Sequence, residues 1–280
     1  MKSVIDMRTA KWMSEHDYFY IMHRFDNSLK DTVSLMNEEN WKTISVSMGV
    51  KMNDKKDIVA LSKYKQRVDY ITIDIAHGHC KRMKIAIQCV KKFMPETKII
   101  AGNVATSTAV RDLSSWGADV VKVGIGQGSP CTTKDKTGFT LPMFTCTKNC
   151  SNVYAGDFLK QGERVTVIAD GGVKSNGDIT KAIVAGADMV MAGGLFAACT
   201  DSPAVCSTVN GTLHKAYFGS ASAENKGHNN NIEGKLTNIS SNGMSYEQKL
   251  NEIEQDLQSS ISYAGGEDLG VLKEVEYAEV

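Results

Sequence analysis

The stretch from Val123 to Thr133 has the composition of a loop that presents a catalytic cysteine. Its sequence, VGIGQGSPCTT, places three glycines at alternate positions ahead of Cys131. Glycine lets peptide groups approach a ligand closely, and hydroxyl residues lie on both sides of the thiol. A thiol on a shaped polar loop directly after an apolar strand suits nucleophilic catalysis. The alternative interpretation is a flexible surface loop that happens to contain a cysteine.

Other polar residues follow the ends of further predicted strands. They are Asp74 with His77, Asn103, Asp170-Gly171-Gly172 and Gly193-Gly194. In a parallel barrel such strand ends share one face, where barrel enzymes place their sites. Two double glycines after the last two strands, with a short helix beginning near Leu195, indicate a corner that binds an anion. Because a carboxylate beside that corner suits ribose hydroxyls, we expect a sugar phosphate or a nucleotide as ligand.

The elements that position these residues alternate between strand and helix. Apolar runs predict seven strands, at 18–23, 44–50, 70–76, 97–103, 118–124, 164–172 and 187–194. Helical patterns are predicted at 3–16, 28–40, 54–65, 82–93, 107–116, 177–185 and 245–263, with a less clear helix within 142–161. This alternation of apolar strands and helices indicates a parallel sheet covered by helices.

We therefore predict a single α/β domain over residues 1–280, a TIM (β/α)8-type parallel barrel from which the first strand is missing. An open doubly wound sheet is the alternative, because it tolerates any number of strands. Residues 200–245, rich in glycine, asparagine and serine, are too long for an ordinary connection. They are predicted to be a mobile flap over the active site.

Composition narrows the class of partner. Lys plus Arg and Asp plus Glu number 32 each, so the sequence lacks the basic excess that nucleic acids or membrane surfaces attract. The seven cysteines have no framework spacing, and the sequence has no signal-peptide pattern. A cytoplasmic protein is expected, whose partners are small molecules or other copies of itself.

The loop GIGQGSPCTT and the strand ends AGN, ADGG and AGG together resemble the family of GMP reductases and IMP dehydrogenases. The bacterial reductase branch is the more similar one, through YFYIMHRFD (18–26), YITIDIAHGH (70–79), YFGSAS (217–222), EGK (233–235) and EQDLQSSISYAGG (254–266). A dehydrogenase would normally carry an inserted regulatory domain and an Arg-Tyr pair on the flap. The sequence contains neither.

The resemblance implies an enzyme of purine salvage that reduces GMP to IMP and ammonia with NADPH. Cys131 would attack C2 of the purine, and Thr133 with Glu233 would activate the leaving amino group. The binding positions that the resemblance implies are Ser129, Asp170, Gly172, Gly193, Gly194 and Ser220 for the nucleotide, Asp74, Asn103 and Lys235 for the cofactor, and the backbone carbonyls of Gly126, Gly128 and Cys131 for a monovalent cation such as potassium. A homotetramer is also implied.

Four departures from the family pattern leave alternatives open. Gln127 stands where the family usually has proline, and Pro130 stands where it has an aliphatic residue. The segment 141–150 replaces a more regular stretch, and the expected first strand would precede Met1. The alternatives to an active reductase are a fragment or defective remnant that binds purine nucleotides without turnover, and an IMP dehydrogenase.

Overall fold

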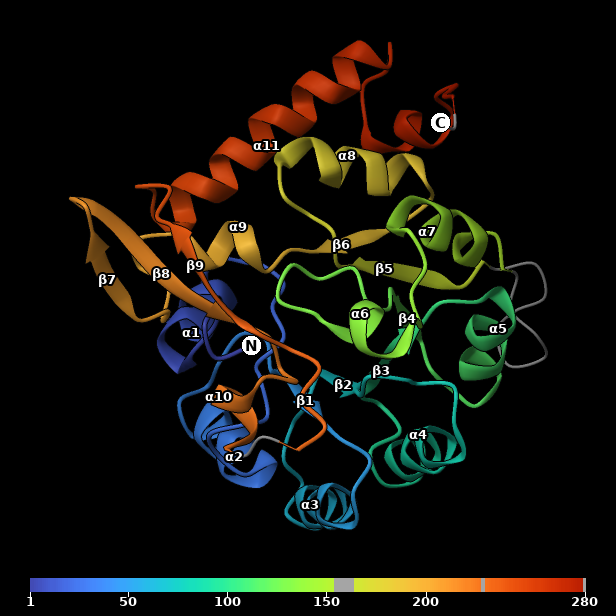
Figure 1. Ribbon diagram of the computed structural model, residues 1–280. Helices are drawn as coiled ribbons and strands as arrows, with labels where there is room; N and C mark the ends of the chain where they lie inside the picture. The colour runs from blue at the N-terminus through green and yellow to red at the C-terminus, as the bar shows by residue number, and fades with distance from the viewer. Residues whose placement is uncertain (154–163, 228–229, 279–280) are drawn as a thin grey trace.

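The computed structural model describes residues 1–153, 164–227 and 230–278. Six parallel strands form one curled sheet in the order of the sequence, with helices along its outer side (Figure 1). The strands are β1 (Ser45–Met48), β2 (Tyr70–Asp74), β3 (Lys98–Val104), β4 (Val120–Val123), β5 (Thr166–Asp170) and β6 (Met189–Met191). A sequential order without a reversal excludes the doubly wound alternative. The predicted α/β class is confirmed, with the sheet forming part of a barrel.

The predicted helices are present with small shifts at their ends. They are α1 (Met7–Glu15), α2 (Leu29–Glu38), α3 (Met52–Lys63), α4 (Lys81–Phe93), α5 (Ser107–Ser115), α7 (Met143–Ser151), α8 (Asn176–Val184) and α11 (Tyr246–Tyr263). Side chains of Asp6, Ser28 and Thr106 accept hydrogen bonds from backbone N–H groups of the first turns that they precede, which is the usual N-cap arrangement. Short helices α6 (Thr133–Thr137), α9 (Gly194–Ala197) and α10 (Ala223–Lys226) and a 3₁₀ turn, η1 (Leu269–Lys273), complete the helical elements. The last part of the predicted helix within 142–161 lies outside the described residues.

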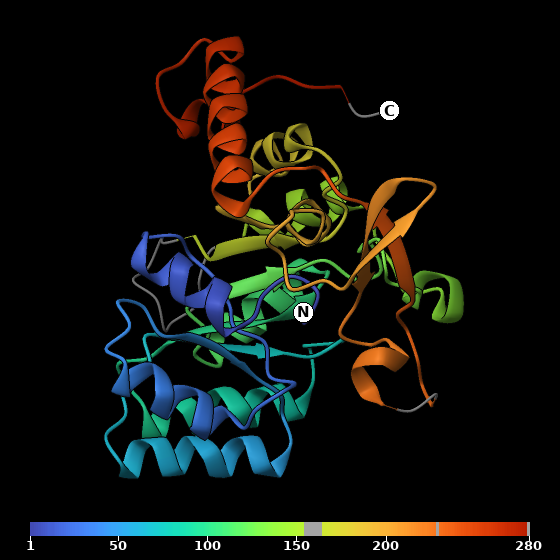
Figure 2. The ribbon, with the colours of Figure 1, turned by 90° about the vertical axis from the view of Figure 1, so that its left-hand side faces the viewer.

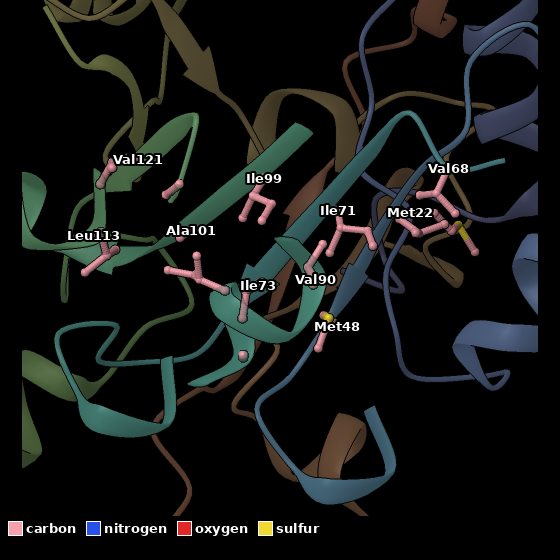
Figure 3. Close-up of a cluster of buried hydrophobic side chains, with 14 of the residues drawn as sticks. Met22, Met48, Val68, Ile71, Ile73, Val90, Ile99, Ala101, Leu113 and Val121 are labelled. Carbon is pink, nitrogen blue, oxygen red and sulfur yellow. The ribbon is translucent and has the colours of Figure 1, made fainter. Parts of the chain in front are cut away.

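The core lies between the sheet and the helices around it. Ile71, Ile73, Ile99 and Val121 are fully buried, and Figure 3 shows them among apolar side chains from neighbouring strands and helices. The long apolar runs of the sequence therefore correspond to strands that are shielded from water. This packing holds the strands in register, and with them the residues at their carboxyl ends.

The predicted strand at 18–23 is wrong as a strand. Only Met22 pairs with the sheet, through a single parallel bridge to Val46 in β1. The residues before Met22 make contacts outside the sheet. The N–H of Tyr18, just after α1, donates to the carbonyl of Met13 within that helix, and the Tyr20 hydroxyl donates to Thr43 O. Among the described residues no strand connects β6 to β1, so the sheet is open between these two edges.

Residues 200–245 contain a second sheet that the sequence patterns did not predict. The antiparallel strands β7 (Cys206–Val209), β8 (Thr212–Phe218) and β9 (Leu236–Ser240) project beside the main sheet (Figure 2). Burial alternates along β8, but one buried position is Lys215, whose ammonium donates to Thr200 O at 2.9 Å and to Ser202 O at 3.3 Å. A charged residue at an inward position hides the apolar alternation by which strands are recognised.

Helix α11 packs outside the sheet, against α8 and η1. Ile253 and Leu257 contact a small apolar cluster formed by Ile179, Ile183 and Leu272. No helix within the described ranges combines the length and the apolar character that crossing a lipid bilayer requires.

Replacing Ile71 with alanine should destabilise the fold by about 2 to 5 kcal/mol, because it leaves a cavity in the core under β2. Ile85 in α4, which is 42% exposed, provides a matched control. Ile85→Ala should cost less than about 1 kcal/mol. Urea unfolding of both variants measures the difference, and equal losses would contradict this position of the core.

Candidate active site

A cavity of about 580 Å³ lies at the carboxyl ends of the parallel strands. It is lined by most of the residues that the sequence singled out: Asp74, Asn103, Gly126, Gly128, Ser129, Cys131, Thr133, Asp170, Gly172, Gly193, Ser220 and Glu233. Gly194 and Lys235 do not line it, although each follows a residue that does. The structure thus brings together side chains from the ends of β2 to β6 and from the segment 200–245.

Cys131, Thr133 and Glu233 form a continuous chain of hydrogen bonds. The Cys131 thiol donates to Thr133 Oγ1 over 3.3 Å, and the Thr133 hydroxyl donates to Glu233 Oε2 over 2.6 Å. The three groups are partly buried and face the same cavity. A thiol is thereby connected through a hydroxyl to a carboxylate, which is an arrangement able to remove the thiol proton and return a proton elsewhere.

Backbone pairing between the cysteine loop and the flap produces this geometry. Cys131 and Gly234 form an antiparallel bridge, in which the Thr132 N–H donates to Glu233 O at 2.9 Å and the Lys235 N–H donates to Pro130 O at 2.8 Å. Lys235 is exposed, so its backbone rather than its side chain has a visible role. The Cys131 N–H donates to Gly128 O at 2.9 Å, which closes the loop tightly before the thiol.

The corner after β5 and β6 is covered by a tyrosine of the flap. Tyr217 on β8 is buried, and burial followed by the nearby Asp170 carboxylate raises the pKa of its hydroxyl. A Cβ atom on Gly193 would lie 2.5 Å from this hydroxyl, so only glycine fits there. Helix α9 begins directly after, at Gly194. Tyr217 was not predicted as a site residue, although it opens the YFGSAS motif.

The opposite part of the cavity contains a buried lysine that the sequence reading missed. Lys122 on β4 pairs with Asp170 Oδ2 at 2.6 Å and with Asp74 Oδ1 at 2.9 Å, and it also donates to Asn103 Oδ1. Burial alone would lower the pKa of Lys122, but the carboxylates of Asp170 and Asp74 outweigh burial and raise it. Burial likewise opposes ionisation of Asp74, yet Lys122 lowers the pKa of Asp74 below its ordinary value. Lys122 lies in the predicted strand 118–124, but the apolar pattern of that strand gave no signal that this lysine points inward.

A cation would have to use backbone oxygens here. No group of three or more His, Cys, Asp or Glu side chains in the described ranges is arranged to hold a metal ion. Gly126 and Gly128 lie in the tight loop that ends at Cys131, and a carbonyl that accepts one N–H, as Gly128 O does, keeps a second lone pair. Carbonyl oxygens are the ligands that suit potassium.

Comparisons with known proteins agree with this geometry. The profile of the IMP dehydrogenase / GMP reductase domain matches residues 21–279. The GMP reductase of Staphylococcus carnosus (strain TM300) is 43% identical over 282 residues, which cover 100% of this chain and 84% of the relative. The GMP reductase of Helicobacter pylori (strain G27) is 45% identical over 281 residues, with 100% of this chain and 84% of the relative covered. With its thiol, hydroxyl and carboxylate joined at the strand ends of a partial barrel, the chain belongs to the IMP dehydrogenase / GMP reductase family.

Proposed function

We propose that this protein is a GMP reductase that converts GMP to IMP and ammonia with NADPH. The observation that carries the proposal is the hydrogen-bond chain from Cys131 through Thr133 to Glu233. The names of the curated relatives support the same substrate. The glutamate at the end of this hydrogen-bond chain, Glu233, belongs to the segment EGK. That segment resembles the flap of the reductases and not the Arg-Tyr pair of a dehydrogenase.

The chemistry divides into two steps at C2 of the purine. Cys131, deprotonated along the path to Glu233, attacks C2, and the exocyclic amino group leaves as ammonia after it receives a proton by the same path. When bound, NADPH would supply a hydride to C2, and breakage of the carbon–sulfur bond would then give IMP and the free Cys131 thiolate. Covalent catalysis replaces one difficult displacement by two easier steps. NADPH would provide the two electrons that reduce C2, the thiol proton would leave with the ammonia, and one proton from solvent would restore the thiol.

The lining of the cavity supports separate places for the two nucleotides. Asp170 is proposed to bind the ribose hydroxyls of GMP, with Ser129, Gly172, Gly193, Gly194 and Ser220 around the purine nucleotide and its phosphate. Asp74 and Asn103 lie on the side of β2 and β3 and are proposed to bind the nicotinamide ribose, with Lys235 nearby. Backbone carbonyls of Gly126, Gly128 and Cys131 are proposed to hold potassium and so to stabilise the loop.

The wider setting is part of the same proposal. We propose a single domain over residues 1–280 whose segment 200–245 moves as a flap, and a homotetramer in the cytoplasm. All seven cysteines are free, which supports a reducing compartment.

Cys131→Ala should abolish GMP-dependent consumption of NADPH, a loss of at least about 1000-fold, because the nucleophile is gone. The exposed Cys206 provides the control, and Cys206→Ala should keep full activity. Loss of NADPH absorbance, together with IMP and ammonium in equal amounts, measures the reaction. Undiminished turnover by Cys131→Ala would overturn the covalent mechanism. A folded protein that binds GMP without oxidising NADPH would be the inactive remnant, and NADH formation from IMP would indicate a dehydrogenase.

Glu233→Gln should lower kcat by about 100- to 10,000-fold and change GMP affinity by less than about threefold, because the amide cannot accept the relayed proton. The exposed Glu267 allows the matched control Glu267→Gln, which should behave as the unmodified protein. Steady-state kinetics with a separate GMP-binding measurement distinguish the two effects. A variant that loses GMP binding and keeps kcat would show that Glu233 binds substrate and does not transfer protons.

A further inference from the structure

Lys122 has three hydrogen-bond acceptors inside the protein. Its Nζ lies 2.9 Å from Asp74 Oδ1 and 2.6 Å from Asp170 Oδ2, and the third acceptor is Asn103 Oδ1. An ammonium group has three protons, so every donor of Lys122 is used. The side chain is only 5% exposed. Lys122 therefore has no donor left for a ligand and acts through the residues that it contacts.

Each carboxylate is held on one side only. The side chains of Asp74 and Asp170 are 30% and 25% exposed, and both residues line the cavity. Asp170 Oδ2 also accepts a hydrogen bond from Asn103 Nδ2 at 2.9 Å. In the described part of the chain, nothing donates a hydrogen bond to Asp74 Oδ2 or to Asp170 Oδ1. One oxygen of each group is thus fixed by the protein and the other is open to a bound molecule.

Both carboxylates form an ion pair with the same lysine. They contact the same ammonium group, and like charges at such short range oppose each other's ionisation unless a cation lies between them. Removing the cation from a buried cluster leaves charges without compensation. The lowered pKa of Asp74 and the raised pKa of Lys122 have the directions expected of such a cluster.

The strands leave room for this lysine at one position. Lys122 is in register with Gly102 on β3. A Cβ atom on Gly102 would lie 2.8 Å from Lys122 Cβ and 2.5 Å from Lys122 O. Because glycine occupies that position, the lysine side chain can extend to the ends of β2, β3 and β5.

We propose that Lys122 is a positioning residue that fixes Asp170 and Asp74 as anionic hydrogen-bond acceptors. One oxygen of Asp170 then faces the ribose of bound GMP, and one oxygen of Asp74 faces the nicotinamide ribose of bound NADPH. The proposal rests on the proposed function, because it takes GMP and NADPH as the ligands. It extends that function by making the recognition of both riboses depend on a buried ammonium group that contacts both carboxylates.

The test compares binding of GMP with binding of 2′,3′-dideoxy-GMP, which lacks both ribose hydroxyls, to the full chain without cofactor. The unmodified protein should prefer GMP by roughly 10- to 100-fold, because hydrogen bonds to a charged group are lost in the analogue. Lys122→Met should weaken GMP binding by a similar factor and reduce the preference to less than about threefold. Calorimetric titration measures both ligands.

Lys91→Met provides the matched control. Lys91 Nζ lies 3.0 Å from Asp119 Oδ2, in an ion pair that does not line the cavity. This variant should keep the preference for GMP. Lys122→Arg, which retains the charge, should recover part of the preference lost in Lys122→Met. A Lys122→Met protein that distinguishes the two ligands as well as the unmodified one does would overturn the proposal.

A double-variant cycle tests whether the lysine acts through the carboxylate. Asp170→Asn should weaken GMP binding, and adding Lys122→Met to it should cost less than about threefold more. Independent, multiplied losses would contradict a positioning role. An unmodified protein that binds neither GMP nor its analogue would instead refute the proposed function itself.

Thermal unfolding provides a second test if Lys122→Met folds but is too unstable for ligand titration. The double variant Lys122→Met with Asp170→Asn has one unpaired carboxylate fewer, so it should unfold at a higher temperature than Lys122→Met alone. Equal or lower stability of the double variant would contradict the proposed charge cluster.

Discussion

The site depends on a short backbone pairing between two segments about a hundred residues apart in the chain. Residues 130–132 and 233–235 exchange backbone hydrogen bonds around the bridge between Cys131 and Gly234. This pairing helps to bring the carboxylate of Glu233 to the hydroxyl of Thr133, because Thr133 begins α6 and Glu233 precedes β9. The thiol loop follows β4 of the parallel sheet, and the carboxylate to which it is connected comes from the segment 200–245. Displacement of that segment from the loop would break the hydrogen-bond chain that begins at Cys131.

A second small set of contacts attaches the flap to the parallel sheet. Strand β8 is anchored to the loop after α9 by the buried ammonium of Lys215, which donates to two backbone carbonyls. The same strand delivers Tyr217 against Gly193. Binding of a nucleotide between these elements would therefore be coupled to the position of Glu233, since β8 pairs with β9 and β9 follows the segment containing Glu233.

Carboxylates in the cavity fall into two chemical classes. Asp74 and Asp170 both contact the ammonium of Lys122, and both line the cavity. Glu233 instead accepts a hydrogen bond from a hydroxyl, and the described residues give it no ion pair. The three carboxylates thus differ in their partners, since Asp74 and Asp170 contact an ammonium group and Glu233 contacts a hydroxyl.

The sequence predicted the class of fold and most of the cavity lining, because both follow from local patterns. Apolar runs mark strands such as 70–76, and glycines or polar residues mark their ends. Sequence patterns failed to predict the features that depend on pairing between distant parts of the chain. Residues 18–23 have strand composition but pair with β1 at Met22 alone. The strands of the flap were missed because Lys215 interrupts the apolar alternation, and Lys122 was missed because its burial depends on partners from three other strands.

The two departures in the cysteine loop are compatible with its shape for identifiable reasons. Proline at 130 lacks an N–H, but the pairing with the flap uses the Pro130 carbonyl and the Thr132 N–H, so no donor is required at that position. The Pro130 ring also fills space, because a Cβ on Gly219 of the flap would touch its Cγ at 3.4 Å. Gln127 donates from Nε2 to Thr140 Oγ1 at 2.6 Å, and Thr140 Oγ1 donates to Ile125 O at 3.2 Å. A hydrogen-bonded brace thus restrains the loop where the family usually has the fixed backbone angle of proline, and both substitutions leave the path from Cys131 to Glu233 intact.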